Sequence, residues 1–294
     1  MPPPSPLPVR ARAFAHFHAL PPEGAGGQRR WLMQAHNFAT EWIEAERSDA
    51  AAIEFGSECE SLLIVHTGAV RITLARPDAP KAEARAHTVS ILPSGHYTLE
   101  LSAGSEVALI ASQRNDAAGR RIINAEACDP RDPRVAPVGR PYRRLHSSGA
   151  VQVLDIDAIQ ASIDKPRLKM LQTESMSINI VEYDGPRDRR QLSPHKHANF
   201  EQGSLAIAGT FVHHLRVPWS NDAGEWRDDE HLQAPSPSLL VVPVEMIHTT
   251  EGVGPEHHFL VDIFSPPRTD FIDKGWVFNA ADYRSATLQG ASDG

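Results

Sequence analysis

Short apolar runs separated by proline and glycine are the feature of this sequence that most limits its fold. The runs are rich in Val, Ile, Leu and Thr and recur through most of the chain. Runs of this length are typical of strands, and turn signals between many such strands indicate an all-β sandwich or barrel. The expected strands are residues 61–65, 69–74, 87–92, 107–111, 177–183, 204–208, 210–217, 238–242 and 258–264.

Helical patterns are scarce. Residues 37–47 and 156–164 are the two stretches that we expect to form short helices. In the second stretch, either Asp155 or Asp157 could cap the amino end, and Pro166 would stop the helix. The predicted fold class is therefore all-β, with a few short helices.

The two halves of the chain resemble each other. The segment 60–68 (ESLLIVHTG) parallels 201–209 (EQGSLAIAG), and the offset is 201 − 60 = 141 residues. Further on, 89–93 (VSILP) parallels 239–243 (LLVVP), at an offset of 239 − 89 = 150 residues. The nine extra residues of the second half are expected in the loop 218–235. A repeat this long indicates a duplicated domain, because solenoid repeats span only about 20–50 residues.

A segment rich in proline and arginine separates the halves. Residues 124–150 contain four prolines and little periodic apolar pattern, which favours a linker. Its arginines at 131, 134, 140, 143 and 144 are interpreted as solvated. The expected organisation is a flexible Pro-rich tail over 1–20, a first domain over 21–123, this linker, and a second domain with a C-terminal tail over 151–294.

The net charge and the number of cysteines limit the expected partners and the expected cellular compartment. The net charge of −8 gives no support to a nucleic-acid or acidic-membrane partner, since both need a basic surface. The only cysteines are Cys59 and Cys128, which favours a reducing compartment. No signal-peptide pattern and no apolar run of about 20 residues is present, so we expect a cytoplasmic protein.

Histidine is concentrated in the second half, where eight of the 15 histidines lie between His195 and His258. His195 and His197 are two residues apart, so in a strand both face one side and can reach one ion. Glu201 and Gln202 could bring an oxygen ligand back, and His248 follows a later strand. Such a set suits one divalent ion of Fe, Mn, Co, Ni or Zn and leaves open coordination positions.

These residues resemble the two motifs of the cupin superfamily, G-x5-H-x-H-x3,4-E-x6-G and P-x-G-x2-H, over residues 185–248. The resemblance implies two tandem jelly-roll domains, the second of which holds a metal on His195, His197, Glu201 and His248. The sequence departs from the motifs in two places. Nine residues instead of five separate Gly185 from His195, and Glu245 stands where the second motif has glycine.

The oxygen ligand is a choice between two neighbours. Glu201 gives the spacing HxHx3E, whereas Gln202 leaves the usual six residues before Gly209. Strand alternation puts Glu201 on one face with Leu205 and Ile207, and large apolar residues more often point into a barrel. A carboxylate also neutralises part of the metal charge. We therefore favour Glu201 and leave Gln202 open.

The first half has the spacing of the two motifs, but other residues stand at the positions of the metal ligands. The 141-residue offset places Glu54 and Gly56 at the two histidine positions of the first motif. Thr98 stands where the last histidine belongs, and His96 lies two residues earlier. We expect this half to be a degenerate, metal-free cupin.

Candidate residues around the site come from the strand after Gly209 and from the segments that follow it. Alternation puts His214 and Arg216 on one face and His213 and Leu215 on the other, and either face could line the cavity. We name Gln202 and His214 as catalytic candidates and Arg216 and Trp219 as substrate-binding candidates. The acidic loop 221–230 is either a lid or a surface hairpin, and the tail 265–278 could wrap the barrel or reach another subunit.

The resemblance favours a metal-dependent enzyme. The spacing and the bicupin arrangement are similar to ring-cleaving cupin dioxygenases, which implies an Fe(II) dioxygenase acting on a small phenolic or other oxygen-bearing substrate. One alternative is a metal-dependent isomerase or lyase that uses the metal as a Lewis acid. Another is a non-enzymatic bicupin that binds a small ligand. Since cupins commonly dimerise, a homodimer is expected.

Overall fold

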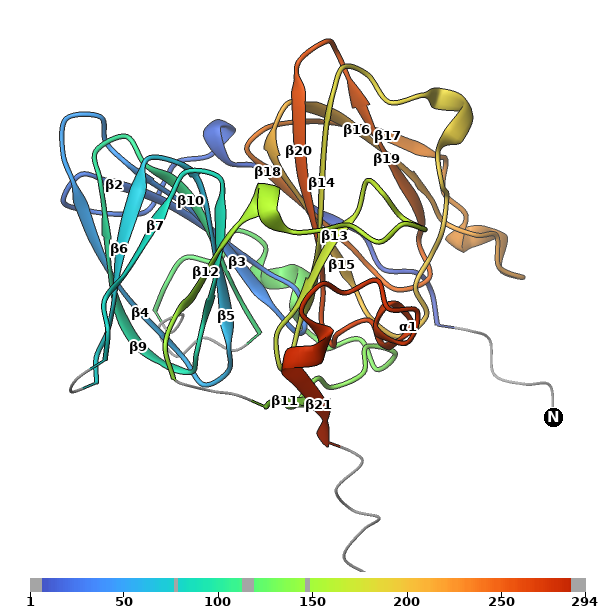
Figure 1. The fold of residues 1–294 in the computed structure, drawn as a ribbon. Helices are drawn as coiled ribbons and strands as arrows, with labels where there is room; N and C mark the ends of the chain where they lie inside the picture. Colours follow the sequence, from blue (N-terminus) through green and yellow to red (C-terminus); the bar gives the residue numbers. More distant parts are fainter. Residues whose placement is uncertain (1–6, 77–78, 113–118, 146–148, 287–294) are drawn as a thin grey trace, which may run out of the picture.

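The computed structural model describes residues 7–76, 79–112, 119–145 and 149–286, and it forms two β lobes side by side (Figure 1). Within these residues, α1 (Thr269–Asp273) is the only α-helix. No helix among the described segments has the length and apolar character needed to cross a membrane. The short 3-10 turns are η1 (Phe17–Ala19), η2 (Ala125–Cys128), η3 (Ile156–Ala158), η4 (Arg189–Gln191), η5 (Ala223–Glu225) and η6 (Ala280–Asp282).

The first lobe is a sandwich of two antiparallel sheets. Its strands are β2 (Gln28–Gln34), β3 (Ala39–Ala45), β4 (Ala51–Ser57), β5 (Ser61–Thr67), β6 (Ala69–Leu74), β7 (Ala82–Arg85), β8 (Thr88–Leu92), β9 (Gly95–Leu101), β10 (Glu106–Ala111) and β12 (Gln152–Asp155). One sheet has the order β12-β8-β5-β10-β3-β2 and the other β4-β9-β6-β7. A buried apolar cluster that includes Ile43, Phe55 and Leu99 fills the space between them.

The second lobe repeats this architecture. Its strands are β1 (Ala13–His16), β13 (Lys169–Gln172), β14 (Ser177–Asp184), β15 (Gln202–Ala208), β16 (Thr210–Arg216), β17 (Glu230–Pro235), β18 (Ser238–Val242), β19 (Ile247–Val253) and β20 (His257–Phe264). The sheets have the orders β1-β18-β15-β20-β14-β13 and β17-β16-β19. A separate pair, β11 (Tyr142–Arg144) with β21 (Tyr283–Ser285), joins the middle of the chain to its end.

The largest apolar cluster of the molecule lies between the lobes. It combines side chains of the first six-stranded sheet, such as Trp31 and Leu62, with side chains of the second, such as Ile178 and Val261. The outer faces of the two six-stranded sheets therefore pack against each other. Burial of apolar surface there, at about 25 cal/mol per Å², stabilises the contact between the lobes.

Each lobe contributes a strand to the other, which corrects the domain boundaries expected from the sequence. Strand β1, within the predicted tail 1–20, pairs with β18 of the second lobe. Phe17, which follows it, is fully buried between Trp31 and Trp42. In the opposite direction, β12 lies after the predicted linker and pairs with β8 of the first lobe. Residues 1–6 of the expected tail lie outside the described residues.

The pairing register confirms that the halves are structural repeats. In the second lobe, His195 pairs with His248 as an isolated bridge. In the first lobe, Glu54 pairs with Thr98. The offsets between these positions are 195 − 54 = 141 and 248 − 98 = 150, the same two values that relate the sequence motifs. The extra residues fall in the connection between β16 and β17, as predicted.

All nine predicted strands are present, but the helix predicted at 37–47 is wrong, because this stretch forms β3. Its glutamates suggest a polar helix face, yet Glu41 is fully buried. Arg30 donates two hydrogen bonds to Glu41, and Arg120 donates a third at 2.6 Å. Partners on other segments thus override the local pattern. The helix predicted at 156–164 is reduced to η3, in which Asp155 accepts a hydrogen bond from the Asp157 amide, as an amino-terminal cap does.

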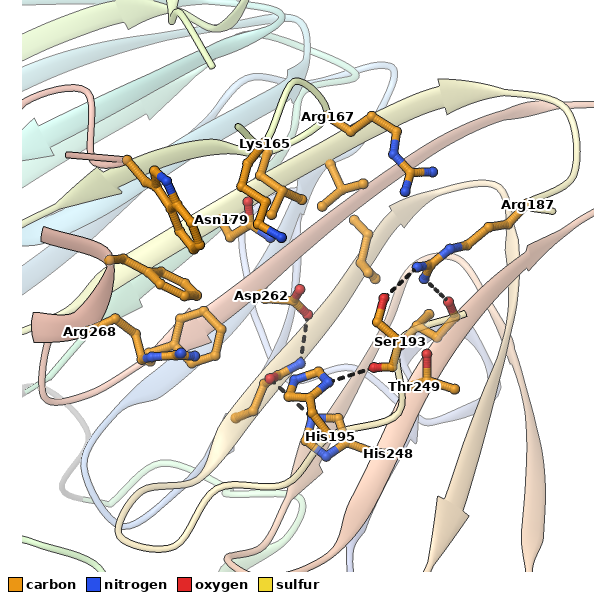
Figure 2. A pocket seen from close by; sticks show the side chains of 18 of the residues that line it. Lys165, Arg167, Asn179, Arg187, Ser193, His195, His248, Thr249, Asp262 and Arg268 are labelled. Atoms are coloured by element: carbon orange, nitrogen blue, oxygen red, sulfur yellow. Dashed lines mark hydrogen bonds between the residues drawn. The ribbon is translucent and has the colours of Figure 1, made fainter. Parts of the chain in front are cut away.

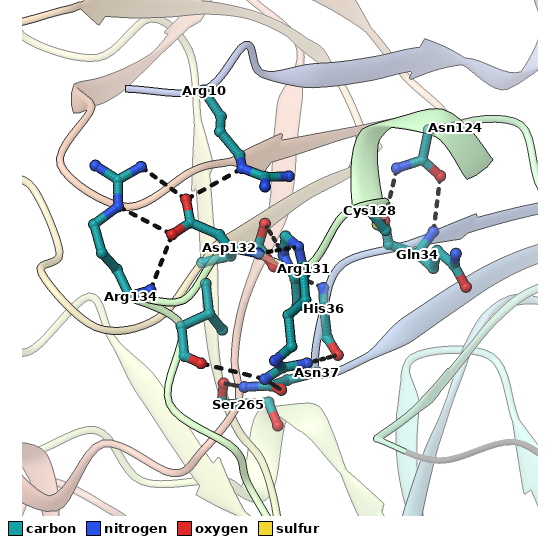
Figure 3. Close-up of polar contacts among 12 residues, drawn as sticks. Arg10, Gln34, His36, Asn37, Asn124, Cys128, Arg131, Asp132, Arg134 and Ser265 are labelled. Atoms are coloured by element: carbon teal, nitrogen blue, oxygen red, sulfur yellow. Dashed lines mark hydrogen bonds and ion pairs between the residues drawn. The ribbon is translucent and has the colours of Figure 1, made fainter. Parts of the chain in front are cut away.

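The predicted linker packs against both lobes and is not a solvated spacer (Figure 3). Arg131 donates to the His36 carbonyl at 3.0 Å and to the Asn37 side chain at 2.8 Å. Asp132 is buried, and its carboxylate accepts hydrogen bonds from Arg134 at 3.0 and 2.7 Å. Arg131 is thus held by hydrogen bonds to neutral groups and Arg134 by an ion pair with Asp132, contacts that the sequence pattern does not reveal.

Candidate metal centre

Three histidines predicted as metal ligands come together in the second lobe. His195 and His197 lie just before β15, and His248 lies on β19. Two backbone hydrogen bonds join His195 to His248 at 3.1 and 2.8 Å. One nitrogen from each of the three rings lies within 4.8 Å of the others. The three imidazoles are therefore arranged around a common point.

The fourth group at this point is Gln202. Its Oε1 lies 3.0 Å from Nε2 of His197 and 3.1 Å from Nε2 of His248. His248 donates from Nδ1 to the Met246 carbonyl at 3.0 Å. A neutral His248 consequently presents a lone pair, not a proton, to the amide oxygen. Two acceptors that face each other at this distance are favourable only with a cation between them, so the donor set fits a metal ion.

Burial keeps His197 and His248 neutral, which is the form that binds metals. Loss of hydration lowers the pKa of His248 to about 3 and that of His197 to about 4. His195 is exposed and donates from Nδ1 to the Ser193 carbonyl at 2.9 Å. Because Nδ1 of His195 is engaged by this hydrogen bond, Nε2 is left free as a ligand atom, an arrangement common in metal sites. The centre therefore has a buried side and an open side.

Gln202 is held in place from behind by β15 and β20. Its Nε2 donates to Ser204 at 3.0 Å and to Asp262 at 2.9 Å, and Ser204 also donates to Asp262 at 2.8 Å. Because the amide nitrogen is engaged with these two acceptors, the amide oxygen must point toward the histidines. Burial is the main cause that raises the pKa of Asp262.

Glu201, the favoured oxygen ligand in the sequence analysis, does not lie in this centre. Its Oε2 accepts a hydrogen bond from the His36 amide at 2.7 Å, and its Oε1 lies 2.8 Å from His36 Nδ1. The preference for Glu201 is therefore wrong. Strand alternation failed because the barrel has two buried faces, and the face of Leu205 is the one between the lobes.

The turn that leads to His248 keeps the backbone of the cupin motif without its glycine. Glu245 has φ of 68°, in the left-handed region that favours glycine. Its amide donates to the His197 carbonyl at 2.7 Å, and its side chain accepts from Lys196 at 2.5 Å. The turn thus ties the two histidine segments together despite the substitution.

A cavity of about 310 Å³ opens beside the centre (Figure 2). His195, Gln202 and His248 line one wall together with Asp262, and the other lining side chains include four cations: Lys165, Arg167, Arg187 and Arg268. Arg268 is held by Asp270 through two hydrogen bonds of 2.7 Å and stacks over Phe271 at 3.8 Å. The tail around α1 therefore wraps the second lobe, which is one of the two alternatives open from the sequence.

Arg187 contacts Ser193, which lies two residues before His195 in the chain. It donates to Ser193 at 3.1 Å and to the Thr250 carbonyl at 2.7 Å, while its Nε is buried without a hydrogen-bond partner among the described residues. Burial, followed by the like charge of Arg167, lowers its pKa. Two guanidinium groups thus face the same space with unfavourable mutual electrostatics, which an anionic ligand would relieve.

Three of the predicted catalytic and substrate-binding residues lie elsewhere. His214 contacts Glu251 at 2.9 Å and His231 at 2.7 Å on the outer face of β16. Arg216 pairs with Asp229, and Trp219 is 74% exposed and stacked on Trp226. None of these three lines the cavity beside the centre. Its cations were missed because they come from separate elements and form no sequence motif.

On the same strand, His213 is the inward-facing residue. It is buried, and Thr250 lies 2.9 Å from its Nδ1. Loss of hydration lowers its pKa to about 3. The face of His213 is therefore the buried one, although His213 itself is not among the residues that line the cavity.

The matching position of the first lobe has different chemistry. Thr98 donates to Glu54 at 2.9 Å, and Gly56 pairs with His96. The side chains expected from the sequence thus occupy the ligand positions of this lobe.

No protein-family model matches the sequence, and no curated protein matches it. Solved structures do match. A variant of the oxalate decarboxylase of Bacillus subtilis aligns with a TM-score of 0.58 and 11% identity over 90% of this chain and 80% of that chain. The oxalate decarboxylase of Lactobacillus farciminis in a formate complex aligns with a TM-score of 0.58 and 12% identity over 96% and 90%. This likeness shows the fold: the chain has the two-lobed β architecture of these structures.

Proposed function

We propose that this protein is a metal-dependent lyase that cleaves a small carboxylate substrate in the cavity beside the histidine centre. His195, His197, His248 and Gln202 would hold one divalent first-row ion. The ion would supply a Lewis acid that polarises a substrate oxygen. Fe(II) and Mn(II) are the first candidates, and Co, Ni and Zn suit the same donors.

The observation that carries this proposal is the positive lining of the cavity. Arg187 and Arg167 face it with like charges, and Lys165 and Arg268 add two more cations, of which Arg268 is paired with Asp270. The one carboxyl group on the lining, Asp262, is hydrogen-bonded to Gln202 and Ser204, and burial raises its pKa. Guanidinium groups bind carboxylates through paired hydrogen bonds, and a cavity of about 310 Å³ suits a small acid. The role of these side chains is to bind and orient the anion beside the metal.

The dioxygenase interpretation has less support. Its suggested phenol-binding residues, His214, Arg216 and Trp219, lie outside the cavity, and the carboxylate expected on the metal contacts His36 instead. The solved structures that resemble this chain are described as decarboxylases. A non-enzymatic binding role would leave the open coordination side at His195 without a use.

The test is turnover of small mono- and dicarboxylates, beginning with oxalate, by protein loaded separately with Mn(II) and Fe(II). We expect release of a cleaved product without stoichiometric consumption of oxygen, monitored with an oxygen electrode. Consumption of one dioxygen per product would refute the lyase and support the dioxygenase. Absence of turnover with tight anion binding would support the non-enzymatic alternative.

Arg187→Met is the matched variant, and Arg216→Met, on the outer surface, is its control. Loss of one charge-assisted contact of about 1.5–3 kcal/mol corresponds to a rise in KM of roughly 10–100-fold. The control should leave KM unchanged. Equal effects of both variants would contradict the assignment of the cavity.

The homodimer stays a prediction from the cupin resemblance.

A further inference from the structure

A second group of potential metal ligands lies where the two lobes meet, away from the histidine centre. Glu182 is on β14 and His257 begins β20, both in the second lobe. His87 precedes β8 in the first lobe, and Asp157 lies in η3, directly after β12. One ligand atom each from His87, Asp157 and Glu182 falls within 4.8 Å of the others.

The carboxylate of Glu182 is unusual because one of its oxygens is buried and unsatisfied. Its Oε1 accepts no hydrogen bond from any described residue, although the side chain is only 11% exposed. Nδ1 of His87 and Nε2 of His257 each lie 3.6 Å from this oxygen. That separation is too long for a hydrogen bond. It is close to the roughly 3.4 Å between two ligands on one tetrahedral ion.

Both histidines have their other nitrogen engaged by a carboxylate. Nδ1 of His257 lies 2.8 Å from Asp184, and Nε2 of His87 lies 3.2 Å from Asp157. A neutral ring that donates to its carboxylate turns its lone pair toward Glu182. This carboxylate–histidine arrangement orients the ligands in many zinc sites, and here it occurs twice around one orphaned oxygen.

The backbone and the charges at this position support the same conclusion. His87 has φ of 64°, a sparsely populated conformation that the surrounding structure maintains. Lys169 lies 3.5 Å from the other oxygen of Glu182 and 3.7 Å from Asp157. One ammonium therefore serves the two carboxylates of Asp157 and Glu182, which leaves a net negative charge that a cation can balance.

We propose that Glu182, His87 and His257 bind a second divalent ion of the Zn(II) type, with Asp157 and Asp184 orienting the two histidines. Two imidazoles and one carboxylate are a ligand set that zinc uses widely. Because His87 belongs to one lobe and the other two ligands to the other, the ion would tie the lobes together. This proposal is independent of the proposed lyase activity.

The experiment measures Zn(II) bound to the chelator-treated full chain after equilibrium dialysis. We expect two ions per wild-type chain, and one ion for Glu182→Gln and for His257→Gln. His248→Gln, in the histidine centre, should also retain one ion. The matched control is His96→Gln, an exposed histidine that should leave two. Two ions in both Glu182→Gln and His257→Gln would overturn the proposal.

A second measurement uses the wild-type protein and does not depend on the folding of any variant. Anomalous scattering from crystals soaked in Zn(II) should show a peak between His87, Glu182 and His257, separate from the peak at His195, His197 and His248. A peak at the histidine centre with none between the lobes would refute the second site while leaving the first intact.

Discussion

Replacement of Gln202 by leucine is the sharpest test of the histidine centre. The substitution keeps the size of the side chain and removes Oε1, one of four converging donor atoms. Loss of even an indirect contact to a metal typically weakens binding 10–100-fold, so we expect the Kd to rise at least about tenfold, or ~1.4 kcal/mol. The metal-free protein should also lose about 1–2 kcal/mol of stability, because Asp262 and Ser204 lose the hydrogen bonds from Nε2.

Glu201→Gln is the matched comparison, since it changes the neighbouring residue and the competing ligand. Its oxygens contact His36, so the metal Kd should change by no more than about twofold. Both affinities are measured by competition with a chromophoric chelator in the Glu182→Gln background, so that the second proposed ion does not contribute. Urea unfolding of the metal-free proteins gives the stability difference.

The two variants give opposite results if the reasoning about the centre is incorrect. A tenfold loss of affinity in Glu201→Gln with normal affinity in Gln202→Leu would restore Glu201 as the ligand. Normal affinity in both variants would remove the oxygen ligand altogether and leave a site of three histidines.

The remaining predictions concern stability. Phe17→Ala should cost about 3–5 kcal/mol in denaturant unfolding, because Phe17 is fully buried between the lobes; a cost below about 1 kcal/mol would mean that this segment is the loose tail expected from the sequence. Burial lowers the pKa of His213 to about 3, so below pH 6.5 the unfolded chain binds a proton at this residue that the folded chain does not. The free energy of unfolding of the metal-free protein should therefore fall by about 2 kcal/mol through His213 between pH 7 and 5. His213→Gln should remove that part of the pH dependence, as measured by urea unfolding. Glu245→Gly should raise the midpoint of thermal unfolding and add up to about 1 kcal/mol of stability, because the φ of 68° favours glycine and the Lys196–Glu245 ion pair at the surface contributes little. A lower midpoint would show that the ion pair contributes more than the backbone strain costs.

The strands and the repeat could be predicted from the sequence because they depend on local pattern. Each of the nine predicted strands is a short apolar run between turn residues, and the offset of 141 residues survives as the pairing of Glu54 with Thr98 and of His195 with His248. The helix predicted at 37–47 failed for a tertiary reason. Glu41 is stabilised in a buried strand by Arg30 and Arg120, which are distant from it in the chain.

Among the residues around the histidine centre, some could also be predicted from the sequence, whereas others required the tertiary structure. The spacing of His195, His197 and His248 was enough to predict that they come together, although His195 and His197 lie in the segment before β15 and not on a regular strand. The choice between Glu201 and Gln202 required knowledge of which barrel face is covered by the other lobe. Arg187, Lys165 and Arg268 reach one cavity from three separate elements, so no spacing links them.

The sequence by itself therefore determined the all-β class, the duplication and the three histidines, because periodicity and short motifs act within a few residues. Only the tertiary structure decided which of Glu201 and Gln202 faces the histidines, which cations line the cavity, and the exchange of β1 and β12 between the lobes. Those features depend on contacts between residues far apart in the chain, and the burial of apolar area between two six-stranded sheets fixes which of those contacts form.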